Sequence, residues 1–237
     1  EVIKTVIRAA GGKGTVIAGT GGNSTQEAIH LTRIAADIGA DATLQVTPYY
    51  NKPTQEGLYR HFTAIADEGG LPVVLYNVPG RTGREISLET VERLAEHERI
   101  IAIKEACDDV DRVSSICRST DLTVLSGDDS LTLPRMSVGA KGVISVASNV
   151  VPREVAELCR AAIAGDLQAA CKQHLRLFPL FRDLFIETNP IPVKAALAMA
   201  GYIKEEYRLP LCPLQPENRQ KLRATMNALG IKLQPEN

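Results

Sequence analysis

The chain has 237 residues, of which 44% are hydrophobic, which is enough for one substantial core; single α/β barrels have roughly 250 residues. The formal net charge is −1, so the basic excess typical of proteins that bind nucleic acid or anionic membranes is absent. Apolar runs are short compared with the roughly 20 residues of a membrane helix. We therefore expect a globular protein that acts on neither nucleic acid nor membranes.

Cysteine and histidine usage narrows the chemistry. The five cysteines are odd in number and form no Cys-x-x-Cys pair; they are Cys107, Cys117, Cys159, Cys171 and Cys212. This pattern favours reduced thiols in a cytoplasmic protein over a disulfide framework. The four histidines are scattered, without an i, i+4 pair. We expect no metal site and no cofactor.

In chain order, residues 1–10 have apolar side chains at helical spacing, with no capping residue before them. This predicts a chain that begins inside a helix and a natural protein that is longer at its N-terminus. Six short apolar runs then predict buried parallel strands, at 15–19, 42–48, 72–77, 100–104, 122–126 and 142–146. Helices are predicted between the earlier strands, at 24–40, 54–68 and 87–97, the first opening with the capping box Ser24-Thr-Gln-Glu27.

After residue 150 the pattern is helical only, with helices predicted at 152–164, 167–185, 192–200 and 216–229. The fold class is therefore α/β. We predict a (β/α)8 TIM barrel that lacks its first two βα units in this chain, followed by a C-terminal helical extension. Residues 1–150 would form barrel units three to eight, and residues 151–237 the C-terminal helices. A doubly wound open sheet is the alternative, because periodicity does not distinguish a closed sheet from an open one.

Reactive side chains of such barrels stand at the C-terminal ends of the strands. Here those ends carry Thr47-Pro-Tyr-Tyr-Asn51, Tyr76-Asn-Val-Pro-Gly-Arg81, Lys104-Glu105 and Ser126-Gly-Asp-Asp129. Three of the six tyrosines of the chain fall at two of these ends. This concentration predicts a site there.

Lys104 closes the apolar run 100–103. Desolvation disfavours an ammonium ion and lowers its pKa, which frees the amine to attack a ketone and form an imine. The alternative is a strand-end lysine paired with a carboxylate such as Glu105. Tyr76 could shuttle protons beside such an imine, or fill the core. Arg81, in a Pro-Gly-Arg-Thr-Gly loop, could clamp a substrate carboxylate or remain solvated.

Two further motifs give weaker signals. Gly19-Thr-Gly-Gly-Asn-Ser24 is not a P-loop and could bind an anion at a helix start, although tight strand-to-helix geometry is the more common reason for such a loop. Asp128-Asp129 could bind a metal, but no histidine or third acid is nearby, so a helix-start cap is expected.

Together these strings resemble the dihydrodipicolinate synthase family, in order and spacing, over essentially the whole chain. The matching segments are Val46-Thr-Pro-Tyr-Tyr-Asn-Lys-Pro-Thr-Gln-Glu-Gly-Leu-Tyr59, Leu75-Tyr-Asn-Val-Pro-Gly-Arg-Thr-Gly83, Ile103-Lys-Glu-Ala106, Ser126-Gly-Asp-Asp129, Gly142-Val-Ile-Ser-Val146 and Asn189-Pro-Ile-Pro-Val-Lys194. The resemblance implies a class I, Schiff-base aldol condensation of pyruvate with L-aspartate-4-semialdehyde to 4-hydroxy-tetrahydrodipicolinate. This reaction belongs to the biosynthesis of lysine and diaminopimelate.

The resemblance also implies roles for individual residues. Lys104 would form the Schiff base, Tyr76 would move protons, and Tyr50 would join a proton relay across a subunit interface. Arg81 would hold the carboxylate of the semialdehyde. Gly127 and Ile144 would line the pyruvate pocket through their backbones.

Regulation and assembly are implied in the same way. Family members often bind L-lysine as a feedback inhibitor, and the matching positions are Asn23, Glu27 and Tyr49. The shared relay implies a homo-oligomer, a dimer or a tetramer.

The family's Gly-Thr-Thr-Gly-Glu string, from the second barrel strand, is absent. An open six-unit barrel exposes strand edges, so this chain alone is expected to fold poorly and to be inactive. N-acetylneuraminate lyase and keto-deoxy sugar acid aldolases share the chemistry but tend to lack the Pro-Gly-Arg-Thr pattern. A non-catalytic barrel that binds a small acid and a metal-dependent aldolase are more distant alternatives.

Overall fold

The computed structural model describes residues 1–235, which divide into two compact units. Unit 1 comprises Glu1–Gly127 and Val138–Gly142, and unit 2 comprises Asp128–Ser137 and the chain from Val143 onward. Among the described residues, no helix is both long enough and apolar enough to cross a bilayer.

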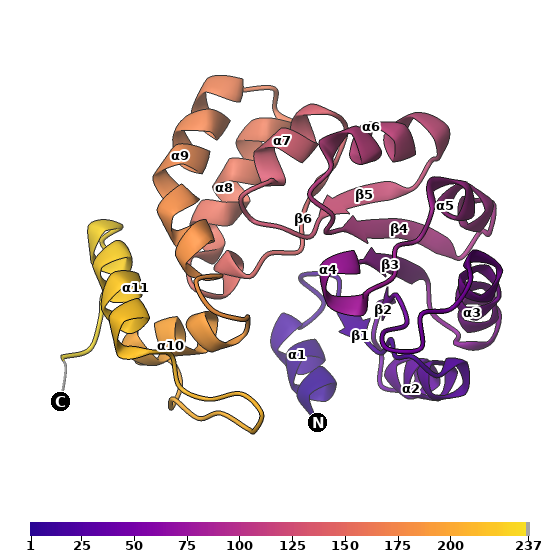
Figure 1. Ribbon diagram of the computed structural model, residues 1–237, viewed down its shortest axis with the longest axis horizontal. Helices are drawn as coiled ribbons and strands as arrows, with labels where there is room; N and C mark the ends of the chain where they lie inside the picture. The colour runs from indigo at the N-terminus through magenta and orange to yellow at the C-terminus, as the bar shows by residue number, and fades with distance from the viewer. Residues whose placement is uncertain (236–237) are drawn as a thin grey trace. The chain divides into compact units, whose positions relative to one another are not determined.

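A parallel sheet forms the centre of unit 1. The strands are β1 (Ile17–Gly19), β2 (Ala42–Val46), β3 (Val73–Asn77), β4 (Ile100–Glu105), β5 (Thr123–Ser126) and β6 (Gly142–Val143). Their spatial order is the chain order, and the first five pair in parallel (Figure 1). All six expected strands are therefore present. A doubly wound sheet reverses its strand order at a switch point, which this order does not do, so that alternative is wrong.

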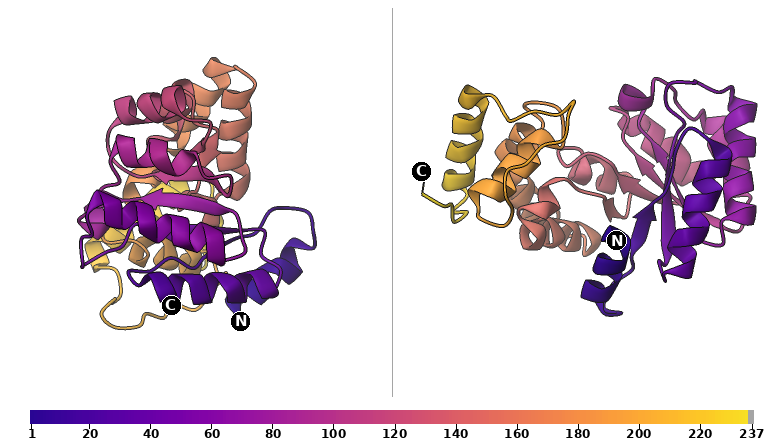
Figure 2. Two further views of the ribbon diagram at one scale, coloured as in Figure 1. Left: turned by 90° about the vertical axis from the view of Figure 1, so that its right-hand side faces the viewer. Right: turned by 90° about the horizontal axis from the view of Figure 1, so that it is seen from below.

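Unit 1 also contains helices, four of which cover one face of the sheet. They are α1 (Val2–Ala10), α2 (Thr25–Asp37), α3 (Gln55–Glu68), α4 (Pro79–Thr82), α5 (Leu88–Ala95) and α6 (Val110–Ser119). Helices α2, α3, α5 and α6 pack side by side, over β2, β3, β4 and β5 respectively (Figures 1 and 2). Side-chain oxygens of Ser24, Thr54, Ser87 and Asp109 accept backbone N–H groups at the starts of these four helices, which is why they begin there.

Near the C-terminal ends of the strands, the two faces of the sheet differ in burial. Strand side chains alternate between faces, and Thr43, Leu75 and Ile103, on the helix-covered face, are fully buried. On the opposite face, Val46, Tyr76 and Lys104 are only half-buried. They share that face because Val46 pairs with Tyr76, and Tyr76 with Lys104, in the register of adjoining strands.

Unit 2 is helical, as expected for the C-terminal region. Its helices are α7 (Thr132–Ser137), the 3-10 turn η1 (Ala147–Asn149), α8 (Pro152–Ile163), α9 (Leu167–Asp183), α10 (Ile191–Met199) and α11 (Pro216–Ala228). Buried apolar residues from α8, α9, α10 and α11 form one core. The buried carboxylate of Asp183 accepts a 2.6 Å hydrogen bond from Thr225, which ties α9 to α11.

Three sequence expectations need correction. The Pro-Gly-Arg-Thr segment is a short helix, α4, because Pro79 can begin a helix and Gly83 ends it at φ +68. Strand β6 ends at Val143 instead of continuing to 146. Helices α6 and α7 were not expected, although Val110, Val113 and Ile116 have the spacing of a helix face.

Candidate functional site

The geometry brings Lys104 and Tyr76 together. They are register partners on β4 and β3, and the Lys104 Nζ lies 4.0 Å from the centroid of the Tyr76 ring. The face of an aromatic ring attracts an ammonium ion at this distance, so the contact stabilises the charged amine. To act as a nucleophile, the Lys104 amine must lose its proton. The phenol of Tyr76 lies next to it and can exchange a proton with it.

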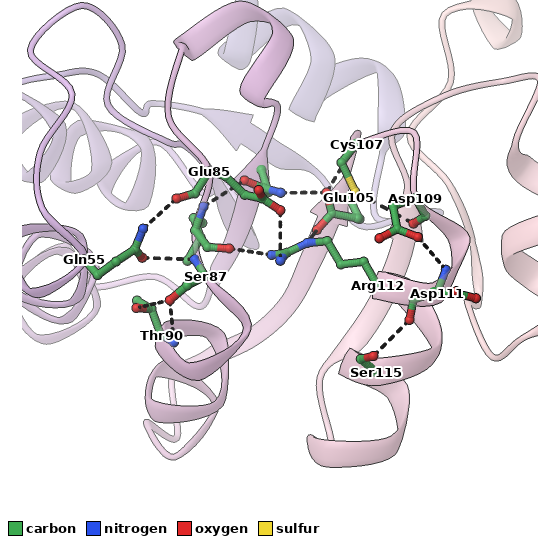
Figure 3. A network of polar contacts seen from close by, with 12 residues as sticks. Gln55, Glu85, Ser87, Thr90, Glu105, Cys107, Asp109, Asp111, Arg112 and Ser115 are labelled. Carbon is green, nitrogen blue, oxygen red and sulfur yellow. Dashed lines mark hydrogen bonds and ion pairs between the residues drawn. The ribbon is translucent and has the colours of Figure 1, made fainter.

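Glu105 follows Lys104 along β4, and its side chain belongs to the opposite, helix-covered face, where it is fully buried. Its carboxylate accepts hydrogen bonds from the Asn77 amide at 2.7 Å, the Cys107 backbone N–H at 3.1 Å and the Arg112 Nε at 2.9 Å (Figure 3). These groups come from β3, the end of β4 and α6. The carboxylate that we considered as an ion-pair partner of Lys104 therefore has a different role, as the centre of a polar network behind the site.

The same network holds the segment that carries Arg81. Arg81 lies on α4, directly after β3, and is exposed. The residues that follow α4 are fixed at several points: Asn77 accepts from the Ile86 N–H at 3.1 Å, and Arg112 donates to the Ile86 carbonyl at 2.6 Å. Gln55 of α3 bridges the Glu85 carbonyl and the Ser87 N–H (Figure 3). The turn that presents Arg81 is thus anchored at its base.

Tyr50 stands in a strained and open position. Its φ is +70, in the left-handed region that costs a non-glycine residue roughly 1–2 kcal/mol, and its side chain is 90% exposed. Such strain persists where the surroundings impose it, and it is frequent at functional sites. Here Asn51, the next residue, donates to the Asn23 carbonyl at 2.9 Å, which holds the loop in place.

The residues expected to bind lysine lie near this loop. Asn23 donates from its amide to the Tyr49 carbonyl at 3.2 Å, so these two are in contact. Glu27 lies in the first turn of α2, where its N–H is capped by the Ser24 hydroxyl, which confirms that half of the predicted capping box. The glycine loop 19–24 is tight: a Cβ added at Gly21 would stand 2.4 Å from the Val46 nitrogen.

Gly127 and Ile144 fall in different units. Gly127 follows β5 in unit 1, where its N–H donates to the Glu105 carbonyl at 2.7 Å. A Cβ at Gly127 would stand 2.5 Å from the Ala106 Cβ, so close approach of the two strand ends requires glycine. Ile144 is half-buried in unit 2. The structure thus groups Lys104, Tyr76 and Gly127 at neighbouring strand ends, and Ile144 is placed within unit 2 alone.

Asp129 is not the cap of α7 that we expected. It accepts from the Val146 and Ala147 N–H groups at 3.0 and 2.9 Å and from the Ser145 hydroxyl, so it fixes the segment after Ile144. Burial raises the pKa of Asp129, against these hydrogen bonds. Asp128 pairs with the fully buried Arg135 at 2.8 Å. Both acids are structural partners within unit 2.

Sequence reasoning missed Asn77 and Arg112. Asn77 lies inside a matched string, but nothing in that string indicates that its amide points away from Tyr76. Arg112 belongs to a helix that was not expected, and its partners are seven and 26 residues away in the chain. Cys107 is another neighbour of the network, where burial and the Glu105 charge raise the pKa of its thiol to about 12. A thiol this hard to ionise does not compete as a nucleophile.

Comparisons with known proteins identify the family of this chain. The chain matches the sequence model described as "Dihydrodipicolinate synthetase family" over residues 1–229. It is 53% identical over 236 residues to the 4-hydroxy-tetrahydrodipicolinate synthase of Aquifex aeolicus, covering 98% of this chain and 80% of that protein. The enzyme of the same name from Thermodesulfovibrio yellowstonii is also 53% identical, with the same coverage. The neuraminate and sugar acid lyases are therefore not favoured.

Solved structures are similar in the same way. A crystal structure of dihydrodipicolinate synthase from Aquifex aeolicus has a TM-score of 0.97 at 53% identity, covering 99% of this chain and 81% of that one. A pyruvate complex of the Acinetobacter baumannii enzyme has a TM-score of 0.95 at 49% identity, covering 98% and 80%. A lysine-bound structure from Cyanidioschyzon merolae has a TM-score of 0.94 at 44% identity, covering 97% and 79%. This chain belongs to the dihydrodipicolinate synthetase family.

Proposed function

We propose that this protein is a Schiff-base lyase that condenses pyruvate with L-aspartate-4-semialdehyde to 4-hydroxy-tetrahydrodipicolinate, in lysine and diaminopimelate biosynthesis. The observation that carries the proposal is the Lys104–Tyr76 pair: an amine 4.0 Å above the ring of a tyrosine on the adjoining strand. The enzymes that share half of its residues carry the name of this activity.

The chemistry follows from the pair. The Lys104 amine attacks the keto carbon of pyruvate, and loss of water gives an imine. Tyr76 delivers and accepts the protons of this step and of the conversion to an enamine, which requires a neighbour to help a phenol of pKa about 10 exchange them. The enamine carbon attacks the semialdehyde. The amino group of the adduct then closes the ring and releases Lys104.

The other site residues bind and orient the substrates. Arg81, on the anchored turn α4, holds the carboxylate of the semialdehyde through two charge-assisted hydrogen bonds. Gly127, at the end of β5, faces pyruvate with its backbone. The pyruvate complex of the Acinetobacter baumannii relative supports pyruvate as the first substrate.

Tyr50 completes the proton relay in the site of a second subunit, so the active form is a homo-oligomer, a dimer or a tetramer. The exposed side chain and the strained backbone of Tyr50 support this role. L-Lysine binds as an inhibitor at Asn23, Glu27 and Tyr49. The lysine-bound relative and the Asn23–Tyr49 hydrogen bond support that site.

The six sequential strands belong, in this proposal, to a (β/α)8 barrel of which residues 1–150 supply units three to eight. Residues 151–237 form the helical extension. Because α7 lies within residues 1–150, this proposal assigns it to the barrel, although it packs within unit 2. A cytoplasmic location agrees with the five free thiols.

Borohydride reduction in the presence of pyruvate, followed by peptide mass spectrometry, tests the proposal. A reduced pyruvyl adduct on Lys104 is expected, which the variant Lys104→Arg should lack. The purified enzyme should then consume L-aspartate-4-semialdehyde. An enzyme that binds pyruvate but gives no adduct would instead be a non-catalytic binding protein.

A further inference from the structure

A buried network of polar side chains lies behind Lys104, and its net contribution to stability is expected to be small. Glu105 is a fully buried carboxylate, and Arg112, its partner, has a side chain that is 9% exposed. A buried ion pair loses so much hydration that an apolar pair of the same size is often as stable or more so. Such a pair adds little net stability, so its contribution must be sought in the geometry that it specifies.

Two residues of the network are chain neighbours of residues in the proposed site. Glu105 directly follows the Schiff-base lysine, and Asn77 directly follows Tyr76. The 2.7 Å bond between Asn77 and Glu105 therefore locks the register of the two residues that carry the amine and the phenol. Because Lys104 and Tyr76 point to the other face, the lock acts through the backbone without occupying the substrate side.

Arg112 extends the lock to the segment after α4. Its guanidinium donates to Glu105, to the Ile86 carbonyl and to the Glu85 carboxylate, at 2.9, 2.6 and 3.0 Å. The planar fork of an arginine can hold three acceptors in one fixed arrangement, which a lysine cannot. One side chain of α6 thus fixes the end of β4 relative to the turn that presents Arg81.

We propose that Glu105, with Asn77 and Arg112, is a positioning residue that holds Lys104 against Tyr76 for imine formation. This inference rests on the proposed function and adds residues that do not touch the substrate. The variant Glu105→Gln places an amide donor against Asn77 and Cys107 or against Arg112, whichever way the amide is turned. Loss of the lock shifts Lys104 relative to Tyr76, and a misplacement of about 1 Å can slow a reaction 100-fold.

The test separates an effect on position from an effect on folding in the purified enzyme. Pyruvate is mixed with the enzyme, the reaction is quenched with borohydride at intervals, and the Lys104 adduct is quantified by mass spectrometry. For Glu105→Gln we expect imine formation that is roughly 10- to 100-fold slower, with the same final amount of adduct per chain. A residue that only stabilises the fold would lower the final amount and leave the rate of the folded fraction unchanged.

Rescue provides a second readout. Asn77→Asp alone sets two carboxylates against each other. The double variant Asn77→Asp with Glu105→Gln restores a donor and an acceptor between these two side chains, while the amide still meets the Cys107 N–H. We therefore expect partial rescue, with imine formation faster than in either single variant. If Glu105→Gln does not fold, Arg112→Lys can be tested in its place. This variant keeps the positive charge but lacks the planar guanidinium group, so we again expect slower imine formation with the same final amount of adduct. The control Glu68→Gln breaks the exposed Arg33–Glu68 pair and should change neither rate nor amount.

The outcomes are distinct. A wild-type enzyme that forms no adduct would overturn the proposed function and this inference together. A wild-type enzyme that forms the adduct, with variants that form it equally fast, would overturn the inference alone. A double variant slower than both single variants would also count against it, because the two side chains would then act independently.

Discussion

Single side chains at the strand ends carry the chemistry that we propose for this sheet. Lys104 and Tyr76 share the half-buried face, while Glu105 and Asn77, their neighbours in the chain, are fully buried on the other face. The alternation of a β-strand thus separates the proposed reacting groups from the groups proposed to position them. Arg81, on α4, adds a cation that can select an acceptor with a carboxylate.

Arg81→Ala should weaken the second substrate more than the first. Each charge-assisted hydrogen bond lost is worth roughly 1.5–3 kcal/mol, so we expect the KM for L-aspartate-4-semialdehyde to rise at least about tenfold. The rate at which pyruvate is trapped on Lys104 should stay near wild type. Steady-state kinetics with each substrate varied, together with borohydride trapping, measure both. Unchanged semialdehyde kinetics would remove Arg81 from the site.

His61 should make stability depend on pH. It is 5% exposed, and burial lowers its pKa to about 4, so the folded protein keeps it neutral. The unfolded chain, with a histidine pKa near 6.5, binds the proton first, so the stabilisation is complete above about pH 6.5 and is lost as pH falls toward 4. From pH 7 to pH 5 the free energy of unfolding should fall by about 2 kcal/mol from this residue. Denaturant unfolding of wild type and His61→Gln at both pH values measures this change in the free energy of unfolding. If the free energy fell equally in both proteins between pH 7 and pH 5, the prediction would be refuted.

At the scale of elements, the ends of β4 and β5 approach so closely that only a small residue fits between them. The β4 and β5 ends meet where the Gly127 N–H binds the Glu105 carbonyl, and a Cβ there would stand 2.5 Å from the Ala106 Cβ and 3.0 Å from that carbonyl oxygen. A backbone oxygen cannot move aside as a flexible side chain can. The glycine is therefore required for packing as well as for the proposed pyruvate pocket.

Gly127→Ala should consequently push β5 away from β4. Overpacking of this kind costs roughly 1–3 kcal/mol, and the strain falls directly behind Lys104. We expect a lower melting temperature and slower imine formation. Gly80→Ala is the matched control, because an added Cβ there meets nothing within 4 Å. Thermal unfolding and borohydride trapping of both variants provide the comparison, and a Gly127→Ala enzyme like wild type in both would contradict the clash.

At the scale of the whole molecule, the proposed relay depends on a second subunit. Tyr50 is 90% exposed, and the Asn51–Asn23 bond holds the loop that presents it. A side chain so placed can act in the site of a neighbour more easily than a buried one. The proposal therefore links catalysis to assembly.

Mixing two inactive variants tests that link. Tyr50→Phe chains retain Lys104, and Lys104→Ala chains retain Tyr50, so a hybrid dimer contains one site with both groups only if Tyr50 acts across the interface. In a random mixture, such sites should restore roughly a quarter of the wild-type activity. The activity of separately refolded variants is the baseline. A mixture no more active than the baseline would place Tyr50 in its own subunit's site.

The sequence by itself determined the parallel α/β class, the six strands, the C-terminal helices and the strand ends that carry the candidate residues. These features are local: apolar runs, helix spacing, capping residues and turn chemistry act over a few residues, and so a single chain displays them. Even the pairing of Lys104 with Tyr76 could be anticipated, because parallel strands bring their C-terminal ends to one edge.

Only the tertiary structure decided how the groups behind the site are joined. Arg112 reaches Glu105 and Ile86 from a helix that the sequence pattern did not predict, and Asp129 accepts hydrogen bonds from residues 145–147, far along the chain. Hydrogen bonds of this kind join residues from different elements, and their partners are selected by burial and by the register of the strands. A buried polar group must find some partner, but which partner it finds depends on packing that no local pattern encodes.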